Sequence, residues 1–361
     1  MSAAGHISGA QSAVAPDEQS RASRGCAQGQ AHRLALDRAA AIAAAWKPEV
    51  AARFQRTLGA LTRGIAEAGE SNTVWHGGTL NGDGAPVEFT FSTLDDALRY
   101  TVEIVGPGIV PAARLDRIGQ LLGEIGAPQA GLRLIEDFAA VQGQGTLRWG
   151  GWLGVRHHPC GDAFKLYAEV PPDAADRAAP LLPDGVEPRL RLAGARQARI
   201  AAVGHTLGTD RREVYYALSP GAMTRAELAE MLAPVGLSGL AAALIDAARR
   251  LMIGGGRGGL PDIEYGLSLS TRSGGKEPVA SLFAFAGELL GGDGIVRMQT
   301  LAAAERQGWS LGCYAAMTAP IARRIDRCNH HNVIAVIAGQ KPVLGMHVSL
   351  SPPLPVPEGQ P

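Results

Sequence analysis

The sequence predicts an α+β fold in which ten antiparallel strands close into a barrel and α-helices surround it. Five pairs of short apolar runs follow one another along the chain, and long Ala/Leu-rich stretches separate most of the pairs. Closure is the simplest arrangement of ten such strands, because it leaves no exposed strand edge. The expected pairs are residues 87–92 with 98–105, 152–157 with 163–170, 199–205 with 213–218, 263–271 with 278–286, and 332–338 with 342–350.

The two runs of each pair are separated by residues that favour tight turns. Asp95-Asp96 lies between the first two runs, and Ser273-Gly274-Gly275 lies between the two runs of the fourth pair. Glycine adopts the left-handed backbone that tight turns need, and Asp side chains accept hydrogen bonds from nearby backbone N–H groups. Each pair is therefore predicted to be a β-hairpin.

Four stretches between or before the hairpins are predicted to be helical. Their Leu, Ile and Ala residues recur at mixed spacings of three and four, which is typical of helices that pack one face on a sheet. One start is marked more clearly than the others, because Thr224 followed by Glu227 forms a capping box. The expected helical stretches are residues 37–68, 111–141, 224–251 and 300–327.

The composition favours one globular domain. Hydrophobic residues make up 46% of the 361 residues, and 34 Lys and Arg balance 34 Asp and Glu, so no net charge attracts nucleic acid or an anionic membrane. No segment approaches the roughly 20 apolar residues of a membrane span. We expect a disordered leader over residues 1–30, the barrel domain over 31–351 and a Pro-rich tail over 352–361. The four cysteines follow no close-spaced framework, which favours reduced thiols in the cytoplasm.

Strand alternation indicates which cations can face the barrel lumen. Arg99, Lys165 and Arg212 occupy corresponding places in the second strands of the first three hairpins. Three cations at one end of a lumen repel one another unless an anion lies among them, and a diphosphate accepts hydrogen bonds from such donors. A register shifted by one residue would instead turn these cations outward into solvent.

The first strand leaves a similar choice open. In Val87-Glu88-Phe89-Thr90-Phe91, the aromatic residues share one face and Glu88 shares the other with Thr90. Alternation alone does not decide which of these two faces lines the lumen.

Three segments of the chain resemble the dimethylallyltryptophan-synthase type of aromatic prenyltransferases. The sequence of the second segment, residues 164–171, is most similar to the bacterial branch. The three segments are residues 84–104, with Gly-Ala-Pro-Val-Glu followed by Leu-Arg-Tyr-Thr-Val-Glu, residues 164–171, with Phe-Lys-Leu-Tyr-Ala-Glu-Val-Pro, and more weakly residues 212–216, with Arg-Glu-Val-Tyr-Tyr. The resemblance runs in register with the hairpins from about residue 70 to residue 351. It implies a ten-stranded barrel of ααββ repeats, the PT barrel of that family.

The resemblance also implies roles for particular residues. Glu88 matches the glutamate that binds the indole N–H and takes up a proton, which implies that the Glu88 face is the lumen. Arg99, Lys165 and Arg212 match the cations that hold the diphosphate of the prenyl donor. Tyr167 and Tyr216 match tyrosines that shield the allylic carbocation, and Phe283 is a further candidate for that shield.

The chain departs from the family pattern in its third, fourth and fifth hairpins. Val214 stands where the family repeats a lysine, so one diphosphate cation is missing or replaced, and Arg297 or a lysine from another strand is a candidate replacement. The fourth hairpin has Ser281 and Phe283, and the last has His347 and Ser351, where family members often place aromatic or polar shields. We expect Ser281, His347 and Arg297 to shape the acceptor or diphosphate pocket and to make it differ from that of the fungal members.

The sequence predicts no metal and no cofactor. Synthases that ionise diphosphates with magnesium need clustered carboxylates, and Asp95-Asp96 is the only adjacent pair near the expected site, so magnesium is not expected to be required. His157-His158-Pro159-Cys160 and Cys328-Asn329-His330-His331 both lack the paired spacing of a zinc site.

Two classes of function follow from these observations. The first is a metal-independent transfer of a dimethylallyl group from dimethylallyl diphosphate to an indole acceptor, tryptophan or one of its derivatives. In a variant of that reaction, the acceptor is a phenol or a peptide. The second is a non-catalytic barrel that binds an isoprenoid or fatty phosphate with the same cations and without proton transfer to Glu88.

Overall fold

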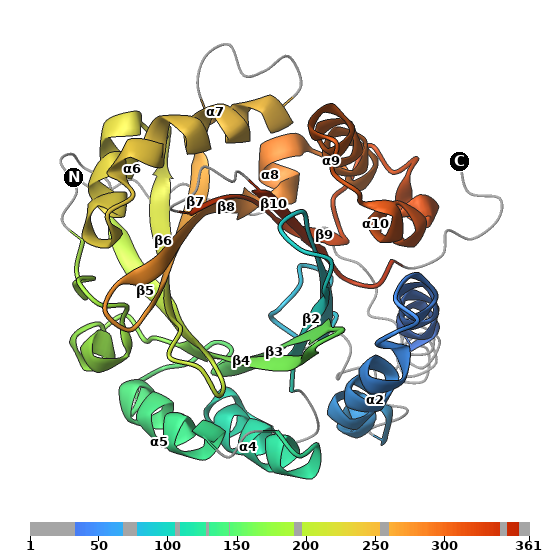
Figure 1. Cartoon of the computed structure of the whole chain (residues 1–361), viewed down its shortest axis with the longest axis horizontal. Helices are drawn as coiled ribbons and strands as arrows, with labels where there is room; N and C mark the ends of the chain where they lie inside the picture. The colour runs from blue at the N-terminus through green and yellow to red at the C-terminus, as the bar shows by residue number, and fades with distance from the viewer. Residues whose placement is uncertain are drawn as a thin grey trace, which may run out of the picture.

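Ten antiparallel strands form a closed barrel in the computed structural model, as the sequence predicts (Figure 1). The structure describes residues 33–67, 78–104, 109–127, 130–143, 145–190, 197–252, 260–339 and 345–353. The predicted leader and residues 354–361 of the predicted tail lie outside these ranges. Within them, no helix is both long and apolar enough to cross a lipid bilayer.

Each strand pairs with its neighbours in the sequence, and β1 pairs with β10 to close the barrel. All five predicted hairpins are observed, with boundaries that differ from the prediction by a few residues. The strands are β1 (Val87–Ser92), β2 (Leu98–Glu103), β3 (Gly151–His158), β4 (Gly161–Glu169), β5 (Ala198–Thr206), β6 (Arg212–Gly221), β7 (Ile263–Arg272), β8 (Lys276–Phe285), β9 (His331–Gly339) and β10 (Gly345–Leu350). We call the end with the hairpin turns the hairpin end and the opposite end the connection end.

Helices surround the barrel on its outer side (Figure 1). A helical segment covers residues 33–46, and the longer α-helices are α2 (Ala51–Glu67), α4 (Arg114–Glu124), α5 (Ala130–Gln142), α6 (Arg225–Leu232), α7 (Ala241–Leu251) and α9 (Asp293–Gln307). The shorter ones are η1 (Pro111–Ala113), η2 (Asp176–Leu181), η3 (Ala233–Val235), η4 (Ser238–Leu240), α8 (Ala286–Leu290), α10 (Gly312–Met317) and η6 (Ala319–Ile321).

The predicted helical stretches are broken where the backbone demands it. Residues 47–50, which include Pro48, form a turn that separates the segment 33–46 from α2. Pro234 and the left-handed Gly236 lie between α6 and α7, because proline cannot donate the next helical hydrogen bond and glycine accepts the left-handed conformation. The predicted capping box is confirmed, since Thr224 accepts a hydrogen bond from the backbone N–H of Glu227.

The core lies between the barrel and its helices. Along β4, Phe164, Leu166 and Ala168 are buried on the outer face, while Lys165 and Tyr167 alternate with them on the inner face. The same alternation gives every strand an apolar face that packs under the helices. The opposite face of each strand lines the lumen, so the register of the strands decides which side chains form a site.

Two buried carboxylates fix loops at the connection end. Glu103 accepts hydrogen bonds from the backbone N–H groups of Thr79 and Leu80 and forms an ion pair with Arg114 of α4. Glu169 accepts from three successive backbone N–H groups, of residues 148–150, at 2.7 to 2.9 Å. These backbone N–H groups are withdrawn from water. Each carboxylate therefore supplies the hydrogen bonds that they would otherwise lack.

Glu103→Ala is expected to lower the free energy of unfolding by about 3–5 kcal/mol, because it removes the carboxylate that balances the charge of Arg114, which is only 5% exposed. Urea denaturation followed by circular dichroism measures this change. Glu124→Ala is the matched control, since Glu124 faces solvent and its ion-pair partners among the described residues are the surface arginines Arg63 and Arg117. Equal denaturation midpoints for the two variants would contradict the assignment of the ion pair as a structural element.

Candidate active site

The ladders of β1 to β4 place the first predicted site residues on one face. Glu88 pairs with Thr101, and Thr90 pairs with Arg99. The same face continues through the pairs of Thr101 with Gly154 and of Gly154 with Lys165. Since the ring of Phe89, on the opposite face of β1, packs against Phe54 of the outer helix α2, the Glu88 face is the lumen, which settles the choice that alternation left open.

The predicted inward placement of Arg212 and Tyr216 is wrong. The guanidinium of Arg212 donates to the backbone carbonyls of Pro180 and Leu182, and the hydroxyl of Tyr216 donates to the carbonyl of Glu187; these acceptors lie outside the barrel. The register of β6 is shifted by one residue from the expectation. Glu213 and Tyr215 therefore face the lumen and Val214 does not.

The predicted placement of Arg297 near the site is also wrong. Arg297 lies on α9, where its side chain donates to the hydroxyl of Thr318 at 3.1 Å and to the carbonyl of Ala315. These contacts tie α9 to α10 outside the barrel. In contrast, Ser281 and Phe283 share the lumen face through their pairs with Ser268 and Gly266.

Cations gather in the hairpin half of the lumen, and each has an acidic partner in the free protein. Arg99 and Arg156 both bind Asp95 in the turn between β1 and β2. Lys165 forms an ion pair with Glu213 across the lumen and donates to the hydroxyl of Tyr215 at 2.8 Å. Burial is the largest single influence and opposes the charge of Lys165, but Glu213 and Tyr167 together outweigh it and raise the pKa of the amine above its ordinary value. Lys165 is therefore a cation at neutral pH.

A fourth cation occupies the rim where the sequence predicted Arg212. The guanidinium of Arg211 donates to the hydroxyl of Ser270 on the lumen face at 3.0 Å and to Glu277 at 2.8 Å. Sequence reasoning missed Arg211, Glu213 and Tyr215 together, because all three follow from the same shifted register. The spacing of Glu213 and Tyr215, which repeats that of Lys165 and Tyr167, was the signal that could have found them.

Aromatic rings line the wall beside Lys165. The ring centroids of Tyr167 and Tyr215 are 5.8 Å apart, and those of Tyr215 and Phe283 are 6.4 Å apart. The ammonium of Lys165 lies 4.8 Å from the ring centroid of Tyr167. At Gly266, an added Cβ would lie 2.1 Å from the ring of Phe283, so only glycine lets that ring lie flat against β7. This wall offers π faces that can stabilise a carbocation.

Glu88 lies deeper, toward the connection end. Its carboxylate accepts a hydrogen bond from the side-chain amide of Asn332, which also donates to the carbonyl of Leu80 at 2.7 Å. Burial raises the pKa of Glu88 to about 7, although the hydrogen bonds of Asn332 and Ser349 oppose that rise. Burial therefore outweighs these two hydrogen bonds, and the carboxyl of Glu88 is only partly ionised at pH 7. A pKa near 7 is the value that a general base needs at neutral pH.

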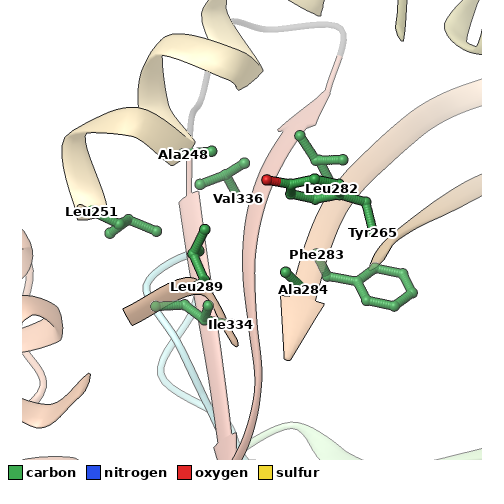
Figure 2. Close-up of a pocket in the computed structure, with 9 residues that line it drawn as sticks. All are labelled: Ala248, Leu251, Tyr265, Leu282, Phe283, Ala284, Leu289, Ile334 and Val336. Atoms are coloured by element: carbon green, nitrogen blue, oxygen red, sulfur yellow. The ribbon is translucent and has the colours of Figure 1, made fainter. Parts of the chain in front are cut away.

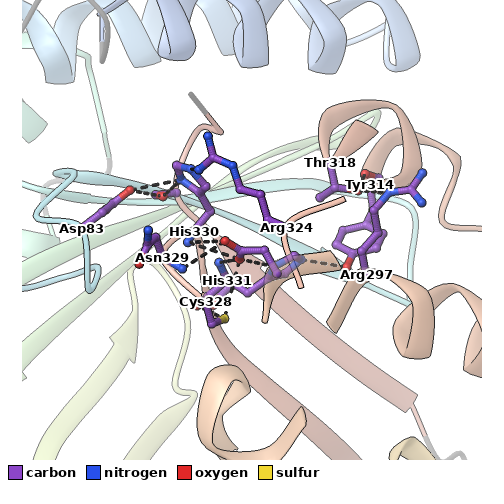
Figure 3. Close-up of polar contacts among 12 residues, drawn as sticks. Asp83, Arg297, Tyr314, Thr318, Arg324, Cys328, Asn329, His330 and His331 are labelled. Atoms are coloured by element: carbon purple, nitrogen blue, oxygen red, sulfur yellow. Dashed lines mark hydrogen bonds and ion pairs between the residues drawn. The ribbon is translucent and has the colours of Figure 1, made fainter. Parts of the chain in front are cut away.

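A second group of titratable side chains lies outside the barrel (Figure 3). Donor atoms of Asp293, Cys328 and His331 lie within 4.8 Å of one another, which among the described residues is a group that could hold a metal ion. Both carboxylate oxygens of Asp293 already accept hydrogen bonds from the backbone of residues 329–331 and from the imidazole of His331. Burial raises the pKa of the Cys328 thiol to about 12, so the thiolate that a zinc site needs is disfavoured. These contacts join α9 to the start of β9.

An apolar pocket lies between α7 and strands β7 to β9 (Figure 2). Leu251, Leu289 and Val336 are among its lining residues, and the hydroxyl of Tyr265 is bound to the carbonyl of Pro261. The pocket carries no convergent polar groups. It is a gap in the packing of helices on the barrel, and the chemistry described above lies in the lumen instead.

The strand order and the ring of helices are those of solved prenyltransferase structures, so the chain has the PT-barrel fold. The chain is similar to a solved structure described as 6-dimethylallyl tryptophan synthase, with 18% sequence identity and a TM-score of 0.62 over 88% of this chain and 95% of that chain. A 6-dimethylallyltryptophan synthase from Micromonospora olivasterospora, solved in complex with DMASPP and Trp, is 16% identical, with a TM-score of 0.57 over 83% of this chain and 98% of that chain.

The prenyltransferase PriB, solved with L-tryptophan and dimethylallyl thiolodiphosphate, is 17% identical and has a TM-score of 0.60, over 91% of this chain and 95% of that chain. No protein-family model and no curated protein matches the sequence. At these identities the similarity establishes the fold. The function rests on the site.

Glu88→Gln is expected to stabilise the protein relative to the wild type as the pH rises. A carboxyl whose pKa is raised from 4.5 to about 7 stabilises the fold fully below pH 4.5 and loses that contribution as the pH rises to 7. The difference in unfolding free energy between variant and wild type should grow by about 3 kcal/mol over this interval. Urea denaturation at several pH values measures it. The exposed Glu136→Gln is the control, and a parallel pH dependence in all three proteins would rule out a raised pKa at Glu88.

Proposed function

We propose that the protein transfers a dimethylallyl group from dimethylallyl diphosphate to an indole acceptor, tryptophan or a tryptophan derivative. The observation that carries the proposal is the arrangement inside one lumen of a cation cluster, an aromatic wall and a buried carboxylate with a pKa near 7. Relatives with the same fold are described as tryptophan prenyltransferases solved with donor analogue and tryptophan, which supports the proposal.

The cations act on the diphosphate. Arg99, Arg156 and Lys165 exchange their acidic partners for the donor's diphosphate, and Arg211 takes the place that the sequence gave to Arg212. When the allylic C–O bond ionises, negative charge grows on the departing pyrophosphate, and fixed cations stabilise that charge more strongly in the transition state than in the ground state. The ion pair between Lys165 and Glu213 must break before the diphosphate can bind Lys165.

The aromatic wall and Glu88 act on the other two partners. Tyr167, Tyr215 and Phe283 stabilise the allylic cation through their ring faces, by about 0.5–2 kcal/mol each, and exclude water from it. Glu88 accepts a hydrogen bond from the indole N–H and takes up the proton that the ring loses after the new bond forms. Ser281 lies on the same face and shapes the acceptor pocket.

The proposed reaction needs neither magnesium nor another cofactor, because lumen cations supply the electrostatic stabilisation that magnesium supplies elsewhere. We place it in the cytoplasm on the grounds of the cysteine usage. The alternative function is non-catalytic binding of an isoprenoid or fatty phosphate by the same cations, without proton transfer to Glu88.

The full chain incubated with dimethylallyl diphosphate and tryptophan is expected to release pyrophosphate and to give a product heavier by one prenyl unit, with equal rates in excess EDTA and in added magnesium. Tryptophan-containing cyclic dipeptides, indole, tyrosine and a Trp peptide form the acceptor panel, read by mass spectrometry.

Glu88→Gln should bind the donor normally and lose about 10²–10⁴-fold in turnover. In the wild type, kcat/KM should rise with pH through about 7, because the base must be ionised.

Donor binding without product from any acceptor would favour the non-catalytic barrel. Restoration of an EDTA-abolished activity by magnesium would overturn the metal-independent mechanism. Wild-type turnover by Glu88→Gln would remove Glu88 from the mechanism.

Tyr215→Ala is expected to divert the cation to water, so that dimethylallyl alcohol increases relative to the prenylated product, because it opens the aromatic wall. Tyr216→Phe is the matched control, since it alters the neighbouring tyrosine on the outer face and removes only its bond to the carbonyl of Glu187. Gas chromatography of the alcohol and liquid chromatography of the product give the ratio. A raised ratio in Tyr216→Phe with none in Tyr215→Ala would mean that the register of β6 is the one first predicted from the sequence.

A further inference from the structure

Two polar atoms in the hairpin half of the lumen are buried and have no hydrogen-bond partner among the described residues. They are Nε2 of His347 and Nη1 of Arg99. Buried polar groups in proteins are almost always hydrogen-bonded, so a pair of unpartnered atoms in one cluster indicates a ligand that supplies the partner. The cationic partner in the pair identifies that ligand as an anion.

The surroundings of His347 explain its present state. On the lumen face its cross-strand neighbours are Ser92 of β1 and Ala335 of β9, which carry no charge. The charged groups that act on it are Arg99 of β2, Arg156 of β3, Lys165 of β4 and Asp95 of the first hairpin turn. Burial first, and then Arg99, lower the pKa of the imidazole to about 3, so His347 is neutral in the free protein at pH 7.

We propose that His347 takes up a proton when the donor's diphosphate binds, and that the imidazolium then gives this proton to the departing pyrophosphate. The proposal rests on the proposed function for the identity of the donor. A diphosphate among Arg99, Arg156 and Lys165 reverses the sign of the local charge, and a nearby negative charge favours the protonated imidazole. The Nε2 atom then donates a charge-assisted hydrogen bond where it now has no partner.

The atoms balance over one turnover. One proton from solvent adds to Nε2 of His347 as the diphosphate binds. The allylic C–O bond breaks with its electron pair on the pyrophosphate oxygen, that oxygen accepts the proton from Nε2, and the imidazole returns to its neutral form. The proton lost by the acceptor ring goes to Glu88, which releases it to solvent before the next turnover, so the two proton transfers are separate and occur on different substrates.

Calorimetry with inorganic pyrophosphate tests the proposal without turnover. Titrations of the full chain at pH 7 in two buffers of different ionisation enthalpy count the protons taken up on binding. His347→Gln removes the proton acceptor and keeps a polar group of similar length, and its uptake should be about one proton lower than that of the wild type, with affinity reduced on the order of tenfold. His205→Gln is the matched control, because His205 pairs with Arg212 on the outer face, and it should match the wild type.

The titration of wild-type protein labelled with ¹³C-histidine is the second measurement. Pyrophosphate at pH 7.5 should move one imidazole signal to the position of an imidazolium, and His347→Gln should lack that signal. The absence of any such shift in the wild type overturns the proposal even where the variant does not fold. Equal proton uptake by wild type and His347→Gln overturns it while leaving the diphosphate site intact, whereas no pyrophosphate binding by the wild type contradicts the proposed function itself.

Discussion

Closure of the sheet is the constraint on which the rest of this structure depends. In a closed barrel every strand is hydrogen-bonded on both sides, so one strand cannot change register without breaking two ladders. The outer face of each strand is fixed by apolar packing under the helices, as Leu166 and Tyr216 illustrate. The side chains of the lumen are then fixed as well. Charged residues such as Lys165 are therefore held inside the barrel, where hydrophobic packing alone would not stabilise them.

That placement carries an electrostatic cost that the free protein meets with its own carboxylates. Asp95 binds two arginines, and Glu213 binds Lys165, so the cations of the lumen are held in place before any ligand arrives. A diphosphate that enters must outcompete these carboxylates, which lowers its affinity and leaves the cations already oriented. Asp95 lies in a hairpin turn and Glu213 lies on a strand, so the turn can yield more readily than the barrel wall.

The hairpins and their order could be predicted because their signals are local: alternation within a strand and turn residues between strands. Glu88, Arg99 and Lys165 lie on the lumen face, as the family resemblance implied, whereas alternation alone left both faces of their strands open. The register of the third hairpin was predicted wrongly, because Arg211-Arg212 and Tyr215-Tyr216 are doublets that fit either register. Only packing against the segment that holds Glu187 decides between the two registers. Arg297 was misplaced for a related reason, since helix periodicity does not show what a helical arginine contacts. The pKa of Glu88 needed the structure, because the sequence does not show how far burial extends.

The charges of the lumen are arranged along its axis. The cations and His347 lie toward the hairpin end, and Glu88 and Asn332 lie toward the connection end. The aromatic wall lies between these two groups along the axis of the barrel. A base placed among the cations would have a lowered pKa and would be a weak proton acceptor, whereas burial away from them keeps the pKa of Glu88 near 7. Two titratable groups with opposite shifts in one lumen can thus perform opposite proton transfers, one to a leaving group and one from a ring, without exchanging roles.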